Sequence, residues 1–151
     1  MSISFECSRS LLGWTWDIKA EDWSGSISKS RDVVVDNKTY KFSRMSMLKF
    51  SDAEFKDDDG KVVATAKSMG LLTWTFEIQY KGETYKMEKT STMGKDMQLS
   101  SEAGDKKLAF HLGAFSFSGS IDAEEAKVFE KEVVMFAFWV FTHMVCQTSS
   151  G

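Results

Sequence analysis

A segment near the C-terminus constrains the fold of this 151-residue chain more than any other feature. Residues 133–146 are apolar on every side of the helix they would form, apart from Thr142 and His143. Such a helix must be surrounded by protein or by lipid. These residues span only about 21 Å, whereas a bilayer crossing needs about 20 apolar residues, and Glu130 and Glu132 prevent extension toward the N-terminus. We therefore expect a helix buried in the core of its own protein. A membrane anchor and a partner-binding helix are the alternatives.

The residues before this segment have the pattern of β-strands. Strict alternation from Leu72 to Tyr80 predicts a strand with one face in a core. Lys81 and Gly82 then separate two β-type runs, which predicts a hairpin. Turn signals recur about every ten residues, as is typical of an antiparallel barrel or sandwich. The other expected strands are residues 3–7, 14–18, 33–35, 39–50 with a break inside, 61–67, 96–99, 107–112 and 115–121.

The C-terminal helix is expected over roughly residues 122–147. Asp122 has the character of an N-cap, and Glu125 follows at the position from which a side chain reaches back to the cap. An antiparallel barrel of about eight to twelve strands has room for such a helix at its centre. We therefore predict a mostly β single domain over residues 1–151, with strands over roughly residues 3–121 wrapped around one buried apolar helix.

Composition limits the classes of function. Twelve Phe and five Trp in a chain that is 42% hydrophobic predict a folded core. A net charge of −3 argues against general nucleic-acid binding, which needs a cationic surface. Cys7 and Cys146 are the two cysteines, and the first residues lack the pattern of a signal peptide. We expect a cytoplasmic protein with reduced thiols.

The order of several segments resembles the tubby C-terminal-like superfamily, which includes tubby proteins, phospholipid scramblases and LURP-one-related proteins. The resemblance covers roughly residues 50–146, and this chain is most similar in size to LURP-one-related members, many of which have no assigned activity. It implies a twelve-stranded barrel threaded by the closing helix. In that superfamily tubby proteins bind phosphoinositide headgroups, while scramblases act at membranes and carry a calcium-binding segment. The segments that carry the resemblance are residues 58–61, 62–67, 74–78, 80–82 and 136–140.

A basic stretch in the N-terminal third is the strongest candidate for a binding site. It has a local excess of four positive charges in an acidic protein, and the aromatic residues Tyr40 and Phe42 are interleaved with them. Such a patch suits an anionic lipid headgroup, and a solvated strand face is the alternative. The basic residues are Lys29, Arg31, Lys38, Lys41, Arg44 and Lys49, opposed by Asp32 and Asp36.

Catalytic and metal motifs are weak. His143 and Cys146 share a helix face, but a zinc site would need two more ligands, for which His111 and Cys7 are the obvious candidates without supporting spacing. The chain has neither a nucleophile elbow nor a phosphate-binding loop, so we expect no enzyme, no metal and no cofactor. Residues 57–59 are expected to form a solvated turn rather than a calcium loop.

A group of aromatic residues near the N-terminus admits two interpretations. Trp14, Trp16 and Ile18 share strand parity, which favours packing into the core. With Leu11, Leu12 and Trp23 they would instead form an exposed patch that touches a membrane or a partner.

The leading hypothesis is a non-enzymatic module that binds an anionic, phosphoinositide-like lipid headgroup or a protein partner at the cytoplasmic face of a membrane. A barrel that carries a small apolar ligand is the second hypothesis, and an enzyme is the third. The oligomeric state is left open.

Overall fold

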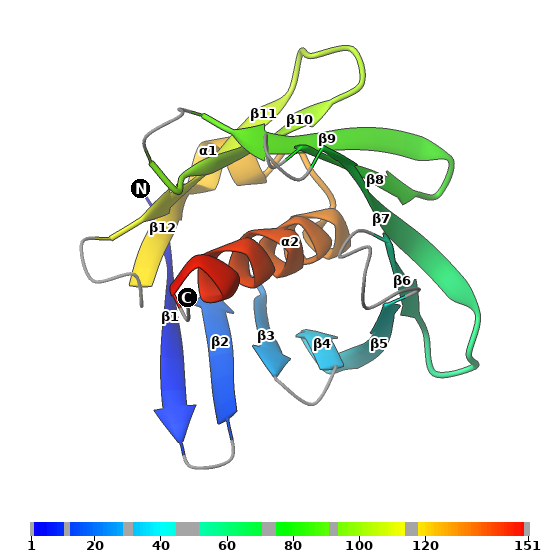
Figure 1. The fold of residues 1–151 in the computed structure, drawn as a ribbon, viewed down its shortest axis with the longest axis horizontal. Coiled ribbons are helices and arrows are strands. Elements are labelled where there is room, and N and C mark those ends of the chain that lie inside the picture. The colour runs from blue at the N-terminus through cyan, green and yellow to red at the C-terminus, as the bar shows by residue number, and fades with distance from the viewer. Residues whose placement is uncertain are drawn as a thin grey trace.

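The computed structural model describes residues 2–10, 13–28, 32–44, 52–70, 75–90, 94–113 and 118–149. This part of the chain forms twelve antiparallel strands in sequence order, and β1 pairs with both β2 and β12, so the sheet closes into a barrel. Figure 1 shows α2 passing through the space that the strands enclose. The predicted barrel is confirmed. Its strands are β1 (Ser2–Ser10), β2 (Gly13–Lys19), β3 (Ser24–Ser28), β4 (Asp32–Val35), β5 (Lys38–Arg44), β6 (Asp52–Lys56), β7 (Val62–Gly70), β8 (Thr75–Tyr80), β9 (Glu83–Lys89), β10 (Met97–Ser101), β11 (Lys107–Leu112) and β12 (Ser118–Asp122).

Strand β8 shows how the alternating sequence determines the two faces of the sheet. Phe76, Ile78 and Tyr80 are buried, while the side chains between them are more accessible to solvent. The β8–β9 turn then places Lys81 at a φ of 51° and Gly82 at a φ of 78°. Two successive positive φ angles give a turn whose twist matches the strands beside it, so the predicted hairpin forms.

The N-terminal third completes the barrel. Trp16 and Ile18 are each 1% exposed, and the Phe5 ring lies 6.0 Å from that of Trp16. The prediction that this parity faces the core is therefore confirmed for these two residues. Trp23 packs at the margin of the core. The side chain of Trp14 and residues 11–12 lie outside the described part of the chain.

Strand β3 was not predicted, because its sequence of Ser and Gly residues has little β propensity. The close packing of the central helix against β3 explains why a glycine occupies position 25. A Cβ at this position would lie 2.6 Å from Met135 Sδ and 2.9 Å from the carbonyl oxygen of Val34. Strand β3 therefore approaches the helix more closely than a larger residue would permit.

The chain enters the barrel through two helices, where one was expected. Helix α1 covers Ala123–Ala126 and α2 covers Lys131–Ser149. Asp122 is the predicted N-cap, and its Oδ1 accepts a hydrogen bond from the Glu125 amide at 2.9 Å. The Glu125 carboxylate does not return to the cap. It accepts instead from the Ala109 amide of β11 at 3.2 Å.

The break between the helices redirects the chain. Helix α1 packs on β11 and β12, whereas α2 packs on β4, β7 and β8. Between them, the Phe129 ring is buried and lies 6.0 Å from the Tyr85 ring. The expectation of one continuous helix was wrong, because Phe129 is held at the start of the barrel while α2 runs inside it.

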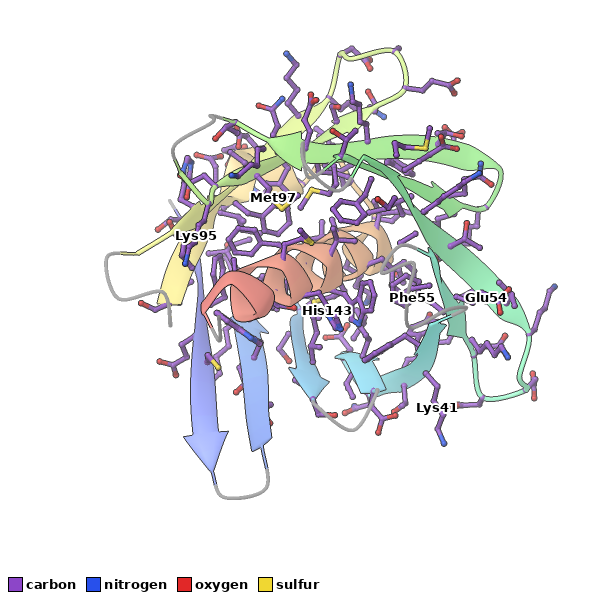
Figure 2. All side chains as sticks on the ribbon, viewed as in Figure 1. Lys41, Glu54, Phe55, Lys95, Met97 and His143 are labelled. Carbon is purple, nitrogen blue, oxygen red and sulfur yellow. The ribbon has the colours of Figure 1, made fainter. Side chains whose placement is uncertain are left out.

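Helix α2 forms the centre of the core. All residues from 133 to 145 are buried. The Phe136 ring contacts Tyr40, Phe55 and Tyr80, which belong to three strands. Figure 2 shows side chains filling the space between helix and strands, with Phe55 and Met97 on the inner side. The helix is thus surrounded by protein. Within the described residues, no helix combines the length and apolarity that crossing a bilayer requires.

Candidate functional site: a lysine-lined mouth of the barrel

A cavity of about 810 Å³ opens at the end of the barrel where α2 begins. Four lysines from four separate segments line it, and we call this cavity the lysine mouth. Three of them lie in or next to the turns of the hairpins β4–β5, β6–β7 and β8–β9. These are alternate turns of an up-and-down barrel, so they lie at the same end of it. They are Lys38 at the start of β5, Lys61 just before β7, Lys81 in the β8–β9 turn and Lys131 at the start of α2.

The turns hold these lysines in place. Asp57 Oδ1 accepts hydrogen bonds from the amides of Asp59 and Lys61, each at 3.0 Å, which fixes the β6–β7 turn. Residues 57–59 thus form the turn expected from the sequence. In the β4–β5 turn, Asp36 adopts a φ of 50°, a conformation that Asp tolerates better than most residues.

Two tyrosines support the lysines. The Lys38 ammonium lies 5.4 Å from the centre of the Tyr40 ring, and the Lys81 ammonium lies 5.2 Å from the centre of the Tyr80 ring. The Tyr40 hydroxyl raises the pKa of Lys38, and electrostatic interaction with the neighbouring Tyr80 raises the pKa of Lys81. Burial, and then Glu132, raise the pKa of Tyr80. Both lysines therefore keep their charge at neutral pH, and Tyr80 stays a neutral hydroxyl.

Carboxylates balance part of this charge. Asp36 Oδ2 lies 2.6 Å from Lys131 Nζ, and this contact lowers the pKa of Asp36 and raises that of Lys131. Lys81 Nζ lies 3.5 Å from Glu130 Oε1 at the exposed rim. Glu132 lines the lysine mouth itself and is half-buried.

The basic stretch predicted from the sequence does not lie on one face of the strand. Lys38 shares the parity of the buried Tyr40 and Phe42 and lines the mouth. Lys41 has the opposite parity, and Figure 2 shows it pointing away from the barrel. Its cross-strand neighbours are Asp32 and Lys56. The side chain of Arg44 and residues Lys29, Arg31 and Lys49 lie outside the described part of the chain.

Sequence reasoning missed three of the four mouth lysines. Lys61, Lys81 and Lys131 are far apart in the chain, so no local excess of charge reveals them. A signal was nevertheless present, since Lys38, Lys61 and Lys81 each lie in or directly after a hairpin turn. Alternate turns of an up-and-down barrel share one end. A search for charges in alternate turns would have found the site.

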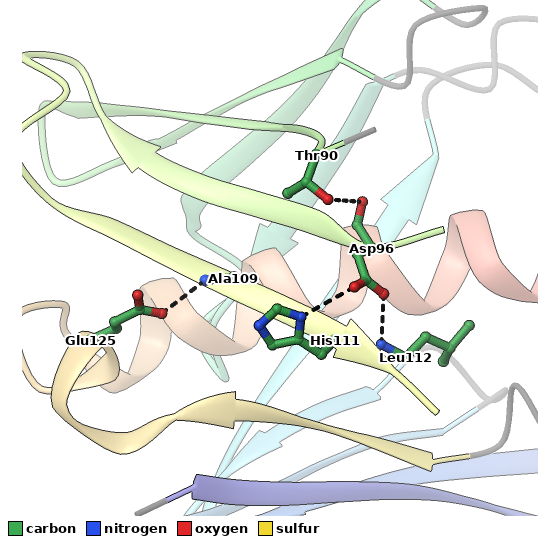
Figure 3. A network of polar contacts seen from close by, with 6 residues as sticks. All are labelled: Thr90, Asp96, Ala109, His111, Leu112 and Glu125. Carbon is green, nitrogen blue, oxygen red and sulfur yellow. Dashed lines mark hydrogen bonds and ion pairs between the residues drawn. The ribbon is translucent and has the colours of Figure 1, made fainter. Parts of the chain in front are cut away.

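A second polar network lies on the outer face of the barrel, beside α1 (Figure 3). Asp96 Oδ1 accepts from the Leu112 amide at 2.8 Å, and Asp96 Oδ2 lies 3.1 Å from His111 Nδ1. Ser120 is the cross-strand partner of His111. None of these three side chains lines the lysine mouth or either of two further cavities among the described residues. The network joins β10 to β11.

His143 and the cysteines do not form a site in the described part of the chain. His143 is buried, its Nδ1 lies 3.2 Å from the Trp139 carbonyl oxygen, and its ring lies 3.9 Å from the Trp139 ring. Cys7 lies half-buried on β1, and the side chain of Cys146 is not among those described. Among the described residues, no group of three or more His, Cys, Asp or Glu side chains lies close enough to hold a metal ion.

Comparisons with known proteins do not identify the chain. No family model, no curated protein and no solved structure matches it. The similarity to the tubby C-terminal-like superfamily therefore stays a prediction from the sequence.

Proposed function

We propose that the chain is a non-enzymatic module that binds the phosphate-bearing headgroup of an anionic lipid, such as a phosphoinositide, at the cytoplasmic face of a membrane. The observation that carries this proposal is the lysine mouth. There, Lys38, Lys61, Lys81 and Lys131 converge with Tyr40 and Tyr80 on one cavity.

The chemistry of the mouth suits phosphate. Lysine ammonium groups and tyrosine hydroxyls donate hydrogen bonds, and phosphate oxygens accept them. The first amides of α2 have no partner within the helix, and the positive end of its dipole lies at the same place. A cavity of about 810 Å³ is within the usual range for small-ligand sites.

The surroundings favour a ligand on a surface over one in the interior. Val62 lines the mouth beside Lys61 and is 40% exposed. An apolar side chain next to cationic ones is typical of proteins that touch anionic membranes. The barrel interior is occupied by the buried side chains of α2, which leaves a carrier hypothesis without a described cavity there.

Vesicle co-sedimentation at increasing salt tests the proposal. The vesicles are neutral phosphatidylcholine alone, or the same lipid with a phosphoinositide. We expect salt-sensitive binding only to the phosphoinositide vesicles. Each lysine near an anionic surface contributes about 1 kcal/mol, so the double variant Lys38→Glu/Lys61→Glu should bind at least about tenfold more weakly.

Lys41→Glu is the matched control, because it reverses one charge on the same strand as Lys38 but on the outer face. This variant should keep nearly all binding. If Lys41→Glu weakens binding as much as the mouth variant, the ligand binds outside the mouth. If the wild-type protein binds no vesicle at low salt, headgroup recognition is wrong, and a protein partner becomes the object of search.

A further inference from the structure

Some charged side chains of the lysine mouth form ion pairs and others do not. The charges left unpaired indicate which charges a complementary ligand carries. Lys131 is paired with Asp36, and Lys81 contacts Glu130. Among the described residues, Lys38, Lys61 and Glu132 line the cavity without an ion pair of their own. The pairing leaves two cations and one carboxylate facing the same space.

A purely anionic ligand complements only part of this arrangement. Phosphate oxygens suit Lys38, Lys61 and the tyrosines, but the same ligand would meet the like charge of Glu132. Glu132 is half-buried, so its charge is less screened by water than that of an exposed side chain. It is also close enough to contribute to two pKa shifts at the cavity: after Tyr40 and Tyr80 it raises the pKa of Lys38, and after burial it raises the pKa of Tyr80.

We infer that, among phosphate-bearing headgroups, the lysine mouth prefers one that also carries a primary ammonium group over one that is purely anionic, and that Glu132 receives this ammonium. The inference rests on the proposed function, since it requires that phosphate binds in the mouth. The shared chemistry is that of an aminophosphate, which occurs both as a free small molecule and as the headgroup of an aminophospholipid.

Two soluble probes separate the contribution of the ammonium group to binding from that of the phosphate. O-Phosphoethanolamine and ethyl phosphate share the phosphate and the two-carbon chain, and only the first carries the ammonium. NMR titration of the ¹⁵N-labelled protein at low salt measures both dissociation constants. We expect the wild-type protein to bind O-phosphoethanolamine about two- to fivefold more tightly, as for a partly exposed ion pair.

Glu132→Gln should reverse this preference. The variant loses the ammonium contact and the like charge, so it should bind ethyl phosphate more tightly and O-phosphoethanolamine no better than before. Glu132→Asp keeps the charge and should restore part of the preference. Glu54→Gln is the control, because it removes the same charge on the outer face, where Figure 2 shows Glu54 away from the helix.

The outcomes separate the two hypotheses. If Glu132→Gln strengthens both probes equally, Glu132 is only repulsive and the inference is overturned. If neither probe shifts the resonances of the wild-type mouth, phosphate does not bind there and the proposed function fails with it.

Vesicles that contain equal fractions of either phosphatidylserine or phosphatidylglycerol then show whether the ligand is a lipid headgroup or a free molecule. A preference for the serine lipid that Glu132→Gln removes indicates a membrane headgroup, and equal binding with selective soluble probes indicates a free aminophosphate.

Discussion

At the residue scale, Asp36 connects the mouth to the fold. Its Oδ1 accepts from the Ser24 amide at 3.0 Å, while its Oδ2 contacts Lys131 Nζ at 2.6 Å. One carboxylate therefore joins the start of β3, the β4–β5 turn and the first residue of α2. Because charge-assisted hydrogen bonds are among the stronger ones in proteins, the ionised form of this group stabilises the folded state.

The sign of this linkage predicts an acid-sensitive contribution. The pKa of Asp36 in the folded protein lies below its ordinary value of 3.8, chiefly because Lys131 donates to it. Stability from this group is present above pH 3.8 and is lost as the pH falls through the lower, folded-state pKa. Asp36→Asn keeps the side-chain shape and tolerates the positive φ. We expect its Tm to lie below that of the wild type at neutral pH, and the difference to shrink as the pH falls below 3.8.

Thermal melts followed by circular dichroism from neutral pH downward measure this difference. Asp58→Asn, which removes an exposed carboxylate from the neighbouring β6–β7 turn, is the control and should parallel the wild type. A difference between Asp36→Asn and wild type that stays constant with pH would mean that the lost contact is not an ionic one.

The same scale shows why the candidate site was only partly predictable. Lys38 belonged to the predicted basic stretch, because neighbouring charges are visible in a sequence. Its partners Lys61, Lys81 and Lys131 come together only after three hairpins and α2 are arranged. Lys41 was grouped with Lys38 by position, yet the period of two along a strand places them on opposite faces.

At the element scale, predictability followed the strength of local patterns. Strand β8 and helix α2 were expected because alternation and all-round apolarity are local signals. Strand β3 was not, since its Ser residues have little β propensity and its Gly25 is required by the close approach of Met135. The break before α2 was missed for a similar reason, because it depends on where Phe129 packs.

Helix α2 should behave as the main source of core stability. The Phe136 ring contacts rings from β5, β6 and β8, and the side chain is completely buried. Truncation to alanine in such a site costs about 3–5 kcal/mol. Since whole domains are stable by only about 5–15 kcal/mol, Phe136→Ala should unfold at much lower urea concentration than the wild type.

Val128→Ala is the control for this measurement. Val128 lies between α1 and α2 and is 51% exposed, so its truncation should change the free energy of unfolding by less than about 0.5 kcal/mol. A loss below about 1 kcal/mol for Phe136→Ala would contradict the packing of α2 against three strands.

At the scale of the whole molecule, closure of the sheet is the feature that joins fold and site. Strands β1 and β12, the first and last strands of the sheet, pair over five positions from Ser2↔Asp122 to Glu6↔Ser118. Phe5 of β1 also contacts Phe138 and Phe141 of α2. A closed barrel has no free strand edge from which to fray, and it holds the hairpin turns of the mouth at fixed distances from one another.

We therefore predict that the β1–β12 seam opens only when the whole barrel unfolds. Native-state hydrogen exchange measured by NMR in increasing denaturant gives an opening free energy for each protected amide. Protected amides of β1 and β12 should exchange with the same free energy as those of β8, because the seam is paired on both sides and covers Phe5. The single turn of α1, which packs mainly on β11 and β12, should exchange at a lower free energy. If the seam amides exchange as readily as those of α1, the barrel opens at β1–β12 under native conditions, and the geometry of the lysine mouth does not depend on closure.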